Sequence, residues 1–345
     1  MLAPMIHVGI VGTGFMAAAH IKAYLKIPGV KVAALCNPSG RNLDGDFSKV
    51  AGNLDTGAPL KLEPGSFKAF HDSKDLFADA SISVIDICTH TSTHETLSIA
   101  ALAAGRNVLC EKPLTRSPEA ARRIAAAAAK ARGIFMPAMC LRFWPEWSWL
   151  KAAIQGGNYG KVLSARFRRV AEPPGWGRQS FFNGSESGGA LFDLHIHDTD
   201  FVQYCFGRPT AVFSSGHSRF SGAIDHVVTQ YHVKDGAVVY AEGGWAMSPG
   251  FGFGMSYTVN FERATADYDS TRGAEPLRLS VEGSPAAIVK PEGPDGYVGE
   301  LRYFLDCVRE GRRPSVVTAD DGASAVEICA AEEASIQRRQ LVALD

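Results

Sequence analysis

Apolar runs and helix-compatible stretches alternate over the first 140 residues of the chain. The apolar runs predict strands at residues 6–11, 30–36, 66–70, 84–88, 107–110 and 134–138. The stretches between them predict helices at residues 17–26, 73–77, 94–104 and 118–132. Such alternation is typical of an α/β fold with a doubly wound parallel sheet and helices on both faces. Residues 38–65, rich in Gly, Pro, Asn and Asp, predict a longer connection with at most one short helix at 47–51.

The pattern changes after Trp144, where several strand-like runs follow one another. They predict strands at residues 161–170, 210–218, 225–233, 237–245, 256–262 and 277–281. Helices are predicted at residues 145–155, 194–206, 298–310 and 320–338. Tight turns such as residues 234–236 join some of the strands, so this half is expected to be an α+β domain with a largely antiparallel sheet. The sequence therefore predicts two domains, residues 1–140 and 141–345.

Composition narrows the class of protein without naming a function. The chain has 345 residues, of which 46% are hydrophobic and 21% charged, and its net charge is −1. This balance does not favour a nucleic-acid or acidic-membrane partner, and no apolar run reaches transmembrane length. The first five residues lack a basic region and the first strand begins at Ile6, so a cytoplasmic enzyme is expected. The seven cysteines form no C-x-x-C pair, which argues against a disulfide framework or a zinc site.

A glycine-rich turn follows the first predicted strand. In Gly12-Thr13-Gly14-Phe15-Met16-Ala17, Gly12 allows a tight turn and Gly14 allows close approach of a phosphate. The helix that follows presents free N–H groups at Phe15 and Met16 to an anion. The position of the turn predicts a dinucleotide pyrophosphate site, and an ordinary glycine turn between strand and helix is the alternative.

Residues at the carboxyl ends of the other strands are further candidates, because ligands of open α/β sheets bind there. Asn37, Ser39 and Arg41 follow the second strand. An acidic residue at position 37 would bind the ribose of NAD and repel the 2′-phosphate of NADP, whereas the neutral Asn37 favours NADP slightly. A solvated turn is the alternative interpretation.

The fourth and fifth strands end near further polar residues. Thr89 and His94 follow one strand, and Glu111-Lys112-Pro113 follows the other. We expect Thr89, His94, Glu111 and Lys112 to lie near the cofactor, because they follow the carboxyl ends of these strands. A lysine at this edge can also bind a substrate hydroxyl. The alternative for the histidine is an ordinary turn residue.

A dense Asp/His cluster occupies the second half of the chain. If this cluster starts a helix, Asp193 and His197, which lie four residues apart, share one face of it. A carboxylate can orient an imidazole and tune its pKa, which suits proton transfer near neutral pH. His195 is a second imidazole in the cluster, although the spacing favours His197 as the base. No metal is expected here, and a purely structural helix cap by Asp193 is the alternative.

Read in order, these motifs resemble the Gfo/Idh/MocA oxidoreductases, a family that includes glucose–fructose oxidoreductase and inositol dehydrogenase. The resemblance covers nearly the whole length and is carried by residues 9–14, 85–89, 94, 105–114, 188–193, 197, 200, 300–301, 304, 311, 314 and 320–322. It implies an N-terminal Rossmann domain and a C-terminal α+β domain with an open-faced sheet. In this family that sheet commonly packs against a neighbouring subunit, which implies a homodimer or homotetramer.

The resemblance also implies roles for matched positions. Lys112 is similar to the family's lysine that contacts the substrate hydroxyl and the nicotinamide ribose. His197 is similar to its proton-transferring histidine, and Asp193 to the acidic partner. His90 and Asn37 depart from the family, which often has proline and aspartate at these positions.

The expected activity is hydride transfer between NAD or NADP and a sugar, inositol or related polyol. Substrate contacts are expected from Lys112, Arg142, Trp176, Asp193 and His197. Trp176 lies in a Pro/Gly-rich loop, where an aromatic face can stack on a sugar ring. Two alternatives remain: a redox-assisted glycosidase that keeps its NAD bound, and a non-catalytic dinucleotide-binding sensor.

Overall fold

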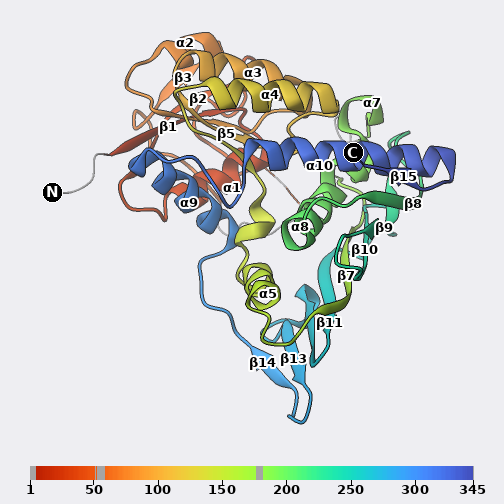
Figure 1. Cartoon of the computed structure of the whole chain (residues 1–345). Helices are drawn as coiled ribbons and strands as arrows, with labels where there is room; N and C mark the ends of the chain where they lie inside the picture. Colours follow the sequence, from red (N-terminus) through yellow and green to blue (C-terminus); the bar gives the residue numbers. More distant parts are fainter. Residues whose placement is uncertain (1–4, 51, 53–58, 176–181, 345) are drawn as a thin grey trace. The chain divides into compact units, whose positions relative to one another are not determined.

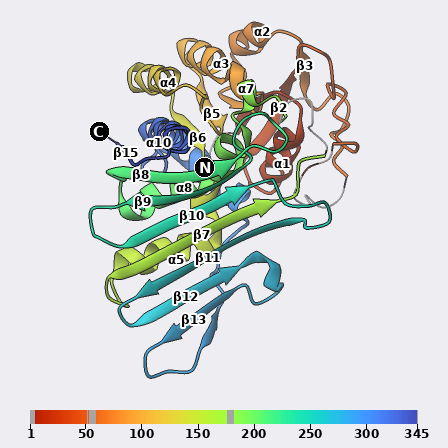
Figure 2. The same cartoon turned by 90° about the vertical axis from the view of Figure 1, so that its right-hand side faces the viewer.

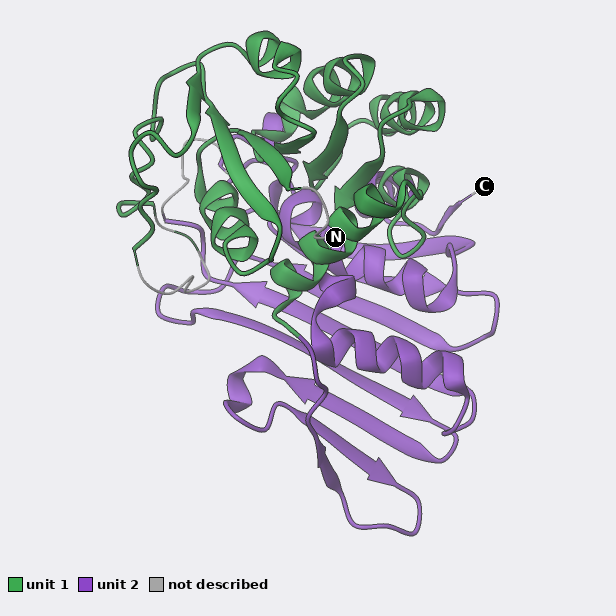
Figure 3. Ribbon diagram, turned by 90° about the vertical axis from the view of Figure 1, so that its left-hand side faces the viewer, with its two compact units in different colours: residues 1–140, 294–323 green, residues 141–293, 324–345 purple. Residues whose placement is uncertain are grey.

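The computed structural model describes residues 5–50, 52, 59–175 and 182–344. Contacts divide the chain into two compact units, coloured separately in Figure 3. Unit 1 consists of Met1–Cys140 and Pro294–Ala323, and unit 2 of Leu141–Gly293 and Ser324–Asp345. No helix in the described part of the chain is both long and apolar enough to cross a membrane.

The sheet of unit 1 confirms the predicted doubly wound fold. Among the described residues it has six strands, all parallel, in the order β3-β2-β1-β4-β5-β6. The strands are β1 (Ile6–Val11), β2 (Val30–Cys36), β3 (Lys68–Phe70), β4 (Val84–Ile87), β5 (Asn107–Glu111) and β6 (Phe135–Ala138). The chain adds strands outward in one direction from β1 to β3 and in the opposite direction from β4 to β6. Ligands of such sheets bind beyond the strand ends, at the point between β1 and β4 where this order reverses.

Helices cover both faces of this sheet. They are α1 (Phe15–Tyr24), α2 (Ser73–Ala78), α3 (Thr91–Ala103), α4 (Pro118–Lys130) and α9 (Gly296–Glu310). Figure 1 shows α2, α3 and α4 together on one face, while α1 and α9 contact each other on the opposite face. Each side of the strands is therefore buried, which explains why they read as continuous apolar runs.

The short helix expected at residues 47–51 is not found in its described part, residues 47–50. The side chain of Asp44 accepts a hydrogen bond from the backbone N–H of Asp46 (3.1 Å), and Asp46 accepts one from Ser48 (2.9 Å). Aspartates that bond their own backbone in this way favour turns over helix. Asp46 also pairs with Lys61 as an isolated antiparallel bridge.

Unit 2 is built on a large, mostly antiparallel sheet, as predicted. Among the described residues it has nine strands in the order β14-β13-β12-β11-β7-β10-β9-β8-β15, with β7 and β10 as the parallel pair. The strands are β7 (Val162–Ala171), β8 (Ala211–His217), β9 (His226–His232), β10 (Val238–Gly244), β11 (Phe253–Phe261), β12 (Ala264–Asp269), β13 (Leu277–Val281), β14 (Ala287–Val289) and β15 (Val342–Ala343). The strands β12, β14 and β15 were not predicted, because two are very short and the third alternates Ala, Thr and Asp.

Helical segments belong wholly or partly to unit 2. They are η1 (Cys140–Phe143), α5 (Pro145–Gly156), α7 (Gly184–Ser187), η2 (Leu191–His195), α8 (Ile196–Phe206), η3 (Ser270–Arg272) and α10 (Ala319–Arg338). Trp147 of α5 is fully buried, with its ring centroid 4.8 Å from Phe201 of α8 and 5.9 Å from Phe167 of β7. Figure 2 looks onto the opposite face, where no helix of the described part of unit 2 covers the strands. The predicted open-faced sheet is therefore confirmed.

Candidate active site

The turn between β1 and α1 has the shape that a dinucleotide needs. Gly12 adopts φ +88°, and a Cβ atom there would lie 2.5 Å from the carbonyl oxygen of Cys88. Gly14 caps α1, and a Cβ at Gly14 would meet no described atom within 4 Å. The first turn of α1 contains no acidic residue, so its free N–H groups and positive dipole end are open to an anion. The residues present therefore fit a bound pyrophosphate.

Phe15 and Met16 begin α1, and both are half-buried. The ring of Phe15 lies so close to Gly52 that any side chain at position 52 would overlap it. The sequence-predicted contact of these two residues with the cofactor stays a prediction.

The turn after β2 is tied to the glycine turn through Asn37. Its amide nitrogen donates to the hydroxyl of Thr13 (2.6 Å), and that hydroxyl donates to the carbonyl of Arg41 (2.6 Å). The amide oxygen of Asn37 accepts from the backbone N–H and the hydroxyl of Ser39 (3.0 and 2.9 Å). An aspartate could not donate to Thr13, so this network accounts for the neutral residue at position 37. Ser39 and Arg41 are exposed beside it.

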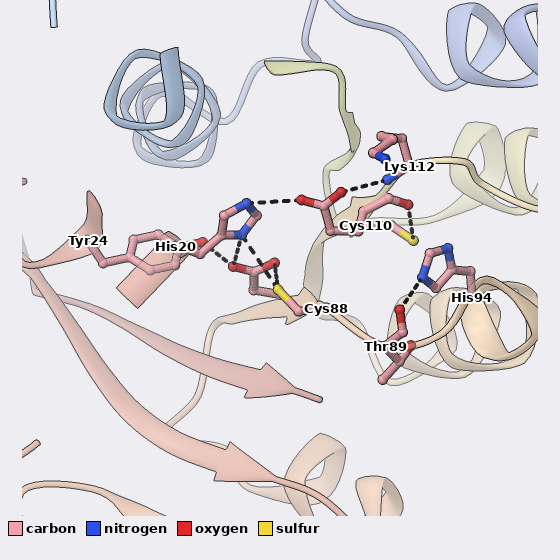
Figure 4. A network of polar contacts seen from close by, with 9 residues as sticks. His20, Tyr24, Cys88, Thr89, His94, Cys110 and Lys112 are labelled. Carbon is pink, nitrogen blue, oxygen red and sulfur yellow. Dashed lines mark hydrogen bonds and ion pairs between the residues drawn. The ribbon is translucent and has the colours of Figure 1, made fainter. Parts of the chain in front are cut away.

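A buried polar network lies beneath the carboxyl end of the unit 1 sheet (Figure 4). The Nδ1 atom of His20, on α1, is 2.8 Å from a carboxylate oxygen of Asp86, on β4. The Nε2 atom of His20 forms an ion pair with Glu111 at 3.2 Å, and the Tyr24 hydroxyl donates to Asp86 at 3.0 Å. Cys88 donates its thiol hydrogen to the other oxygen of Asp86 (3.4 Å). Sequence reasoning missed His20 and Asp86, although a carboxylate inside the apolar run Val84–Ile87 was a signal that a buried partner exists.

The charge state of this network follows from its surroundings. Burial alone would lower the pKa of His20, but the charge of Asp86 and its hydrogen bond raise that pKa well above the ordinary value. His20 is therefore an imidazolium at neutral pH. Burial raises the pKa of the Cys88 thiol, which stays protonated. His20, Asp86 and Cys88 offer ligand atoms within 4.8 Å of one another, but the bonds among these side chains already account for that spacing.

Lys112 lies directly beyond this network. The second oxygen of Glu111 accepts a hydrogen bond from the backbone N–H of Lys112 (3.0 Å), and the Lys112–Pro113 peptide is cis. His94 of α3 is buried, with Nδ1 2.8 Å from the carbonyl of Pro113 and Nε2 3.1 Å from that of Thr89. Burial lowers the pKa of His94, so the ring is neutral. The loops after β4 and β5 thus meet at this side chain (Figure 4).

In unit 2 the predicted Asp/His cluster begins with a π-helical turn. Asp193 lies within η2 and His197 in the first turn of α8, and both side chains are partly exposed. π-turns inside helices are frequent at functional sites. The helical segment begins before the predicted start near residue 194, because η2 continues directly into α8.

His195 is fully buried, whereas Asp193 and His197 are partly exposed. Its Nε2 atom lies 3.1 Å from the hydroxyl of Tyr231 on β9 and 3.4 Å from a carboxylate oxygen of Glu332 on α10. The other oxygen of Glu332 accepts from the Thr199 hydroxyl (3.2 Å). Burial and the charge of Glu332 raise the pKa of Tyr231 well above its ordinary value. These bonds hold η2 against the sheet from inside unit 2.

Of the two remaining candidates for substrate binding, one has a structural partner. Arg142 is 3% exposed, and its guanidinium donates to both carboxylate oxygens of Asp200 (2.8 and 2.6 Å). It also lies over the ring of Tyr204, 4.4 Å from the centroid. The contact of Arg142 with a substrate stays a prediction, and Trp176 lies outside the described residues.

The fold and the glycine turn together define a class: a Rossmann-type dinucleotide-binding protein with an added α+β unit. Residues 6–139 match the model of an oxidoreductase family with an NAD-binding Rossmann fold, Gfo/Idh/MocA. Residues 147–267 match the C-terminal domain of the same family, and the two matches together cover most of the chain. The chain therefore belongs to the Gfo/Idh/MocA oxidoreductases, as the resemblance indicated.

Curated relatives of this family are similar to the chain over most of its length. Inositol 2-dehydrogenase 4 of Saccharopolyspora erythraea is 26% identical, covering 95% of this chain and 91% of that protein. Myo-inositol 2-dehydrogenase of Thermotoga maritima is 27% identical, covering 83% and 87%. A solved levoglucosan dehydrogenase, in complex with NADH and levoglucosan, has a TM-score of 0.83 at 21% identity, covering 98% and 99%. This last likeness shows the shared fold.

Proposed function

We propose that the chain is an NAD(P)-dependent dehydrogenase or reductase that acts on a CH–OH group of a sugar, an inositol or a related polyol. The observation that carries the proposal is the open N-terminus of α1 at Gly14, in a chain whose two halves both match an oxidoreductase family. The inositol and levoglucosan dehydrogenases among its relatives support this substrate class.

Lys112, Asp193 and His197 are the proposed catalytic residues. A bound nicotinamide supplies the hydride acceptor, and the protein supplies orientation and proton transfer. We assign His197 as the base that takes the hydroxyl proton and Asp193 as the carboxylate that orients it. The partial exposure of both side chains supports this choice, because the buried His195 is held by Tyr231 and Glu332.

Lys112 is the proposed ligand of the substrate hydroxyl. Its place directly after β5 supports this role, since ligands of doubly wound sheets bind at these strand ends. Its side chain is partly exposed, whereas the preceding Glu111 is buried. An ammonium group donating to the reacting oxygen stabilises the negative charge that develops there during oxidation.

Activity measurements test this assignment directly. The full chain is assayed with a panel of sugars, inositols and sugar acids, following the absorbance of reduced nicotinamide. We expect Lys112→Ala and His197→Ala each to lower kcat about 100-fold or more, and Lys130→Ala, at the exposed end of α4, to leave it unchanged. Full activity in both site variants would refute the mechanism. Cleavage of an aryl glycoside without net cofactor consumption would replace it with the redox-assisted glycosidase.

NADP is proposed as a cofactor alongside NAD. The neutral Asn37 and the exposed Ser39 and Arg41 support this proposal, because no carboxylate stands at position 37 to repel a 2′-phosphate. Fluorescence titrations with NADH and NADPH compare the two dissociation constants. Arg41→Ala should weaken NADPH roughly 2- to 5-fold, the range of an exposed ion pair, and leave NADH unchanged. If Arg41→Ala changes the dissociation constants of NADH and NADPH equally, Arg41 does not bind the 2′-phosphate.

A homodimer or homotetramer is proposed through the open face of the unit 2 sheet. Large apolar side chains are exposed there on β8, β9 and β10: Phe213 (42%), Val228 (42%), Val238 (52%) and Tyr240 (37%). They line one shallow hollow, and such apolar patches commonly mark protein interfaces. Light scattering should show an oligomer that Val228→Glu dissociates while the fold persists. A monomeric unmodified protein would refute the interface.

A further inference from the structure

We propose that His20 is a positioning residue, whose buried charge holds Glu111 in place and thereby fixes the main chain at Lys112. The catalytic consequence rests on the proposed role of Lys112. The positioning itself is a property of unit 1 and can be measured separately.

The contacts form a continuous path from the core of unit 1 to Lys112. Asp86 lies 2.8 Å from Nδ1 of His20, and Nε2 of His20 lies 3.2 Å from Oε1 of Glu111. Oε2 of Glu111 accepts the backbone N–H of Lys112 at 3.0 Å. Three elements, α1, β4 and β5, contribute one link each, so their packing fixes the path (Figure 4).

The Glu111 carboxylate couples the two ends of this path. One of its oxygens faces His20 and the other binds the Lys112 amide, so the group cannot rotate without changing both contacts. Glu111 is 5% exposed and His20 fully buried. A positive partner on one oxygen holds a buried carboxylate in a single orientation. Loss of the His20 charge therefore lets the Glu111 carboxylate turn away, and the Lys112 amide loses a charge-assisted acceptor.

The peptide after Lys112 is also held by a buried histidine. His94 contacts the carbonyl of Pro113 at 2.8 Å, so both ends of the Lys112–Pro113 unit are bound to groups in the core. Fixing the backbone on both sides limits the positions that the Lys112 side chain can reach. Functional side chains need such support to stay within about 0.5 Å of a productive geometry.

Amide hydrogen exchange at Lys112 tests the inference without cofactor or substrate. His20→Gln removes the charge at similar size, and Glu111→Gln keeps an oxygen acceptor but removes the charge that faces His20. Tyr24→Phe is the matched control, because it deletes a 3.0 Å bond to Asp86 and leaves the contact between His20 and Glu111 intact. Exchange is measured by mass spectrometry on full-length protein, together with the melting temperature of each variant.

We expect His20→Gln to speed exchange of the Lys112 amide about 10-fold or more. This is the effect expected when an amide loses its hydrogen bond to a charged acceptor. The exchange rate of the Lys112 amide in Glu111→Gln should lie between the rates in His20→Gln and in the unmodified protein. Tyr24→Phe should lower the melting temperature while exchange at Lys112 stays the same. In activity assays, His20→Gln should lower kcat about 10-fold or more with KM and cofactor affinity nearly unchanged.

Unchanged Lys112 exchange in folded His20→Gln and Glu111→Gln proteins would overturn the inference. So would equal acceleration in Tyr24→Phe, because that result would show general loosening of unit 1. If His20→Gln does not fold, Glu111→Gln and Tyr24→Phe still decide between these outcomes. Accelerated exchange in a protein with no oxidoreductase activity would refute the proposed function and leave the positioning intact.

Discussion

Alanine substitutions at two glycines of the same turn should have different effects, one on stability and the other on cofactor binding. Gly12 adopts a positive φ and packs against the backbone of Cys88. Gly14 has φ −93°, which any residue adopts, and its Cβ would point into open space. Gly12→Ala should therefore destabilise unit 1, whereas Gly14→Ala should leave the fold intact and obstruct the cofactor.

The structure sets the size of each effect. At Gly12 the left-handed backbone costs about 1–2 kcal/mol for a residue with a Cβ. The contact at 2.5 Å with a backbone carbonyl adds overpacking of about 1–3 kcal/mol, so the expected loss is about 2–5 kcal/mol. At Gly14 the gain from a stiffer unfolded chain, about 0.4–1 kcal/mol, offsets a poorer N-cap of similar size. A methyl group that displaces a phosphate oxygen from one N–H should weaken cofactor binding about 10- to 100-fold.

Urea unfolding followed by circular dichroism measures the first effect, and fluorescence titration with NADH measures the second. Gly14→Ala should unfold at nearly the same urea concentration as the unmodified protein but bind NADH much more weakly. Unchanged NADH affinity in Gly14→Ala would refute the path of the pyrophosphate over Gly14. Unchanged stability in Gly12→Ala would refute the packing argument at Cys88.

Three further predictions concern stability. Trp147→Ala should lower the free energy of unfolding by about 3–5 kcal/mol in urea titrations, because the indole fills the centre of the unit 2 core. Asp200→Ala should cost about 3–5 kcal/mol by removing the carboxylate from the buried Arg142, and a smaller loss than Asp200→Asn would contradict this reasoning. The raised pKa of His20 contributes stability that is fully present below about pH 6.5 and is lost as pH rises through the folded-state pKa. Urea unfolding should therefore show stability falling with rising pH above neutrality, and His20→Gln should flatten this slope.

Local pattern was sufficient to predict most elements of both units. The prediction for residues 30–36 matches β2, and that for residues 277–281 matches β13, because both runs pack apolar side chains against a core. The parallel and antiparallel character of the two sheets also followed, since helices separate the strands of unit 1 and short turns join several of unit 2. The strand β12 was missed because its outward positions carry Thr and Asp beside small inward alanines.

Long-range contacts explain what local pattern could not predict. His20 lies in a run of alanines that reads as an ordinary apolar helix, and its partner Asp86 is 66 residues away. The π-turn before α8 likewise depends on distant packing. A Cβ at Gly243 of β10 would lie 2.5 Å from Nδ1 of His195. The His195 ring therefore fits against this strand only because residue 243 has no side chain. Neither contact has a periodic signal in the sequence.

The two buried histidine networks have a common relation to the proposed catalytic residues. Glu111, bound by His20, directly precedes Lys112, and His195, bound by Tyr231 and Glu332, lies two residues before His197. In each unit, a polar cluster with little or no exposure thus holds the backbone from which a more exposed functional side chain extends. Buried polar groups are costly when they lose their partners, so arrangements that break these hydrogen bonds and ion pairs are unfavourable. The free-energy cost of leaving these buried groups without partners therefore also restricts the backbone positions of Lys112 and His197.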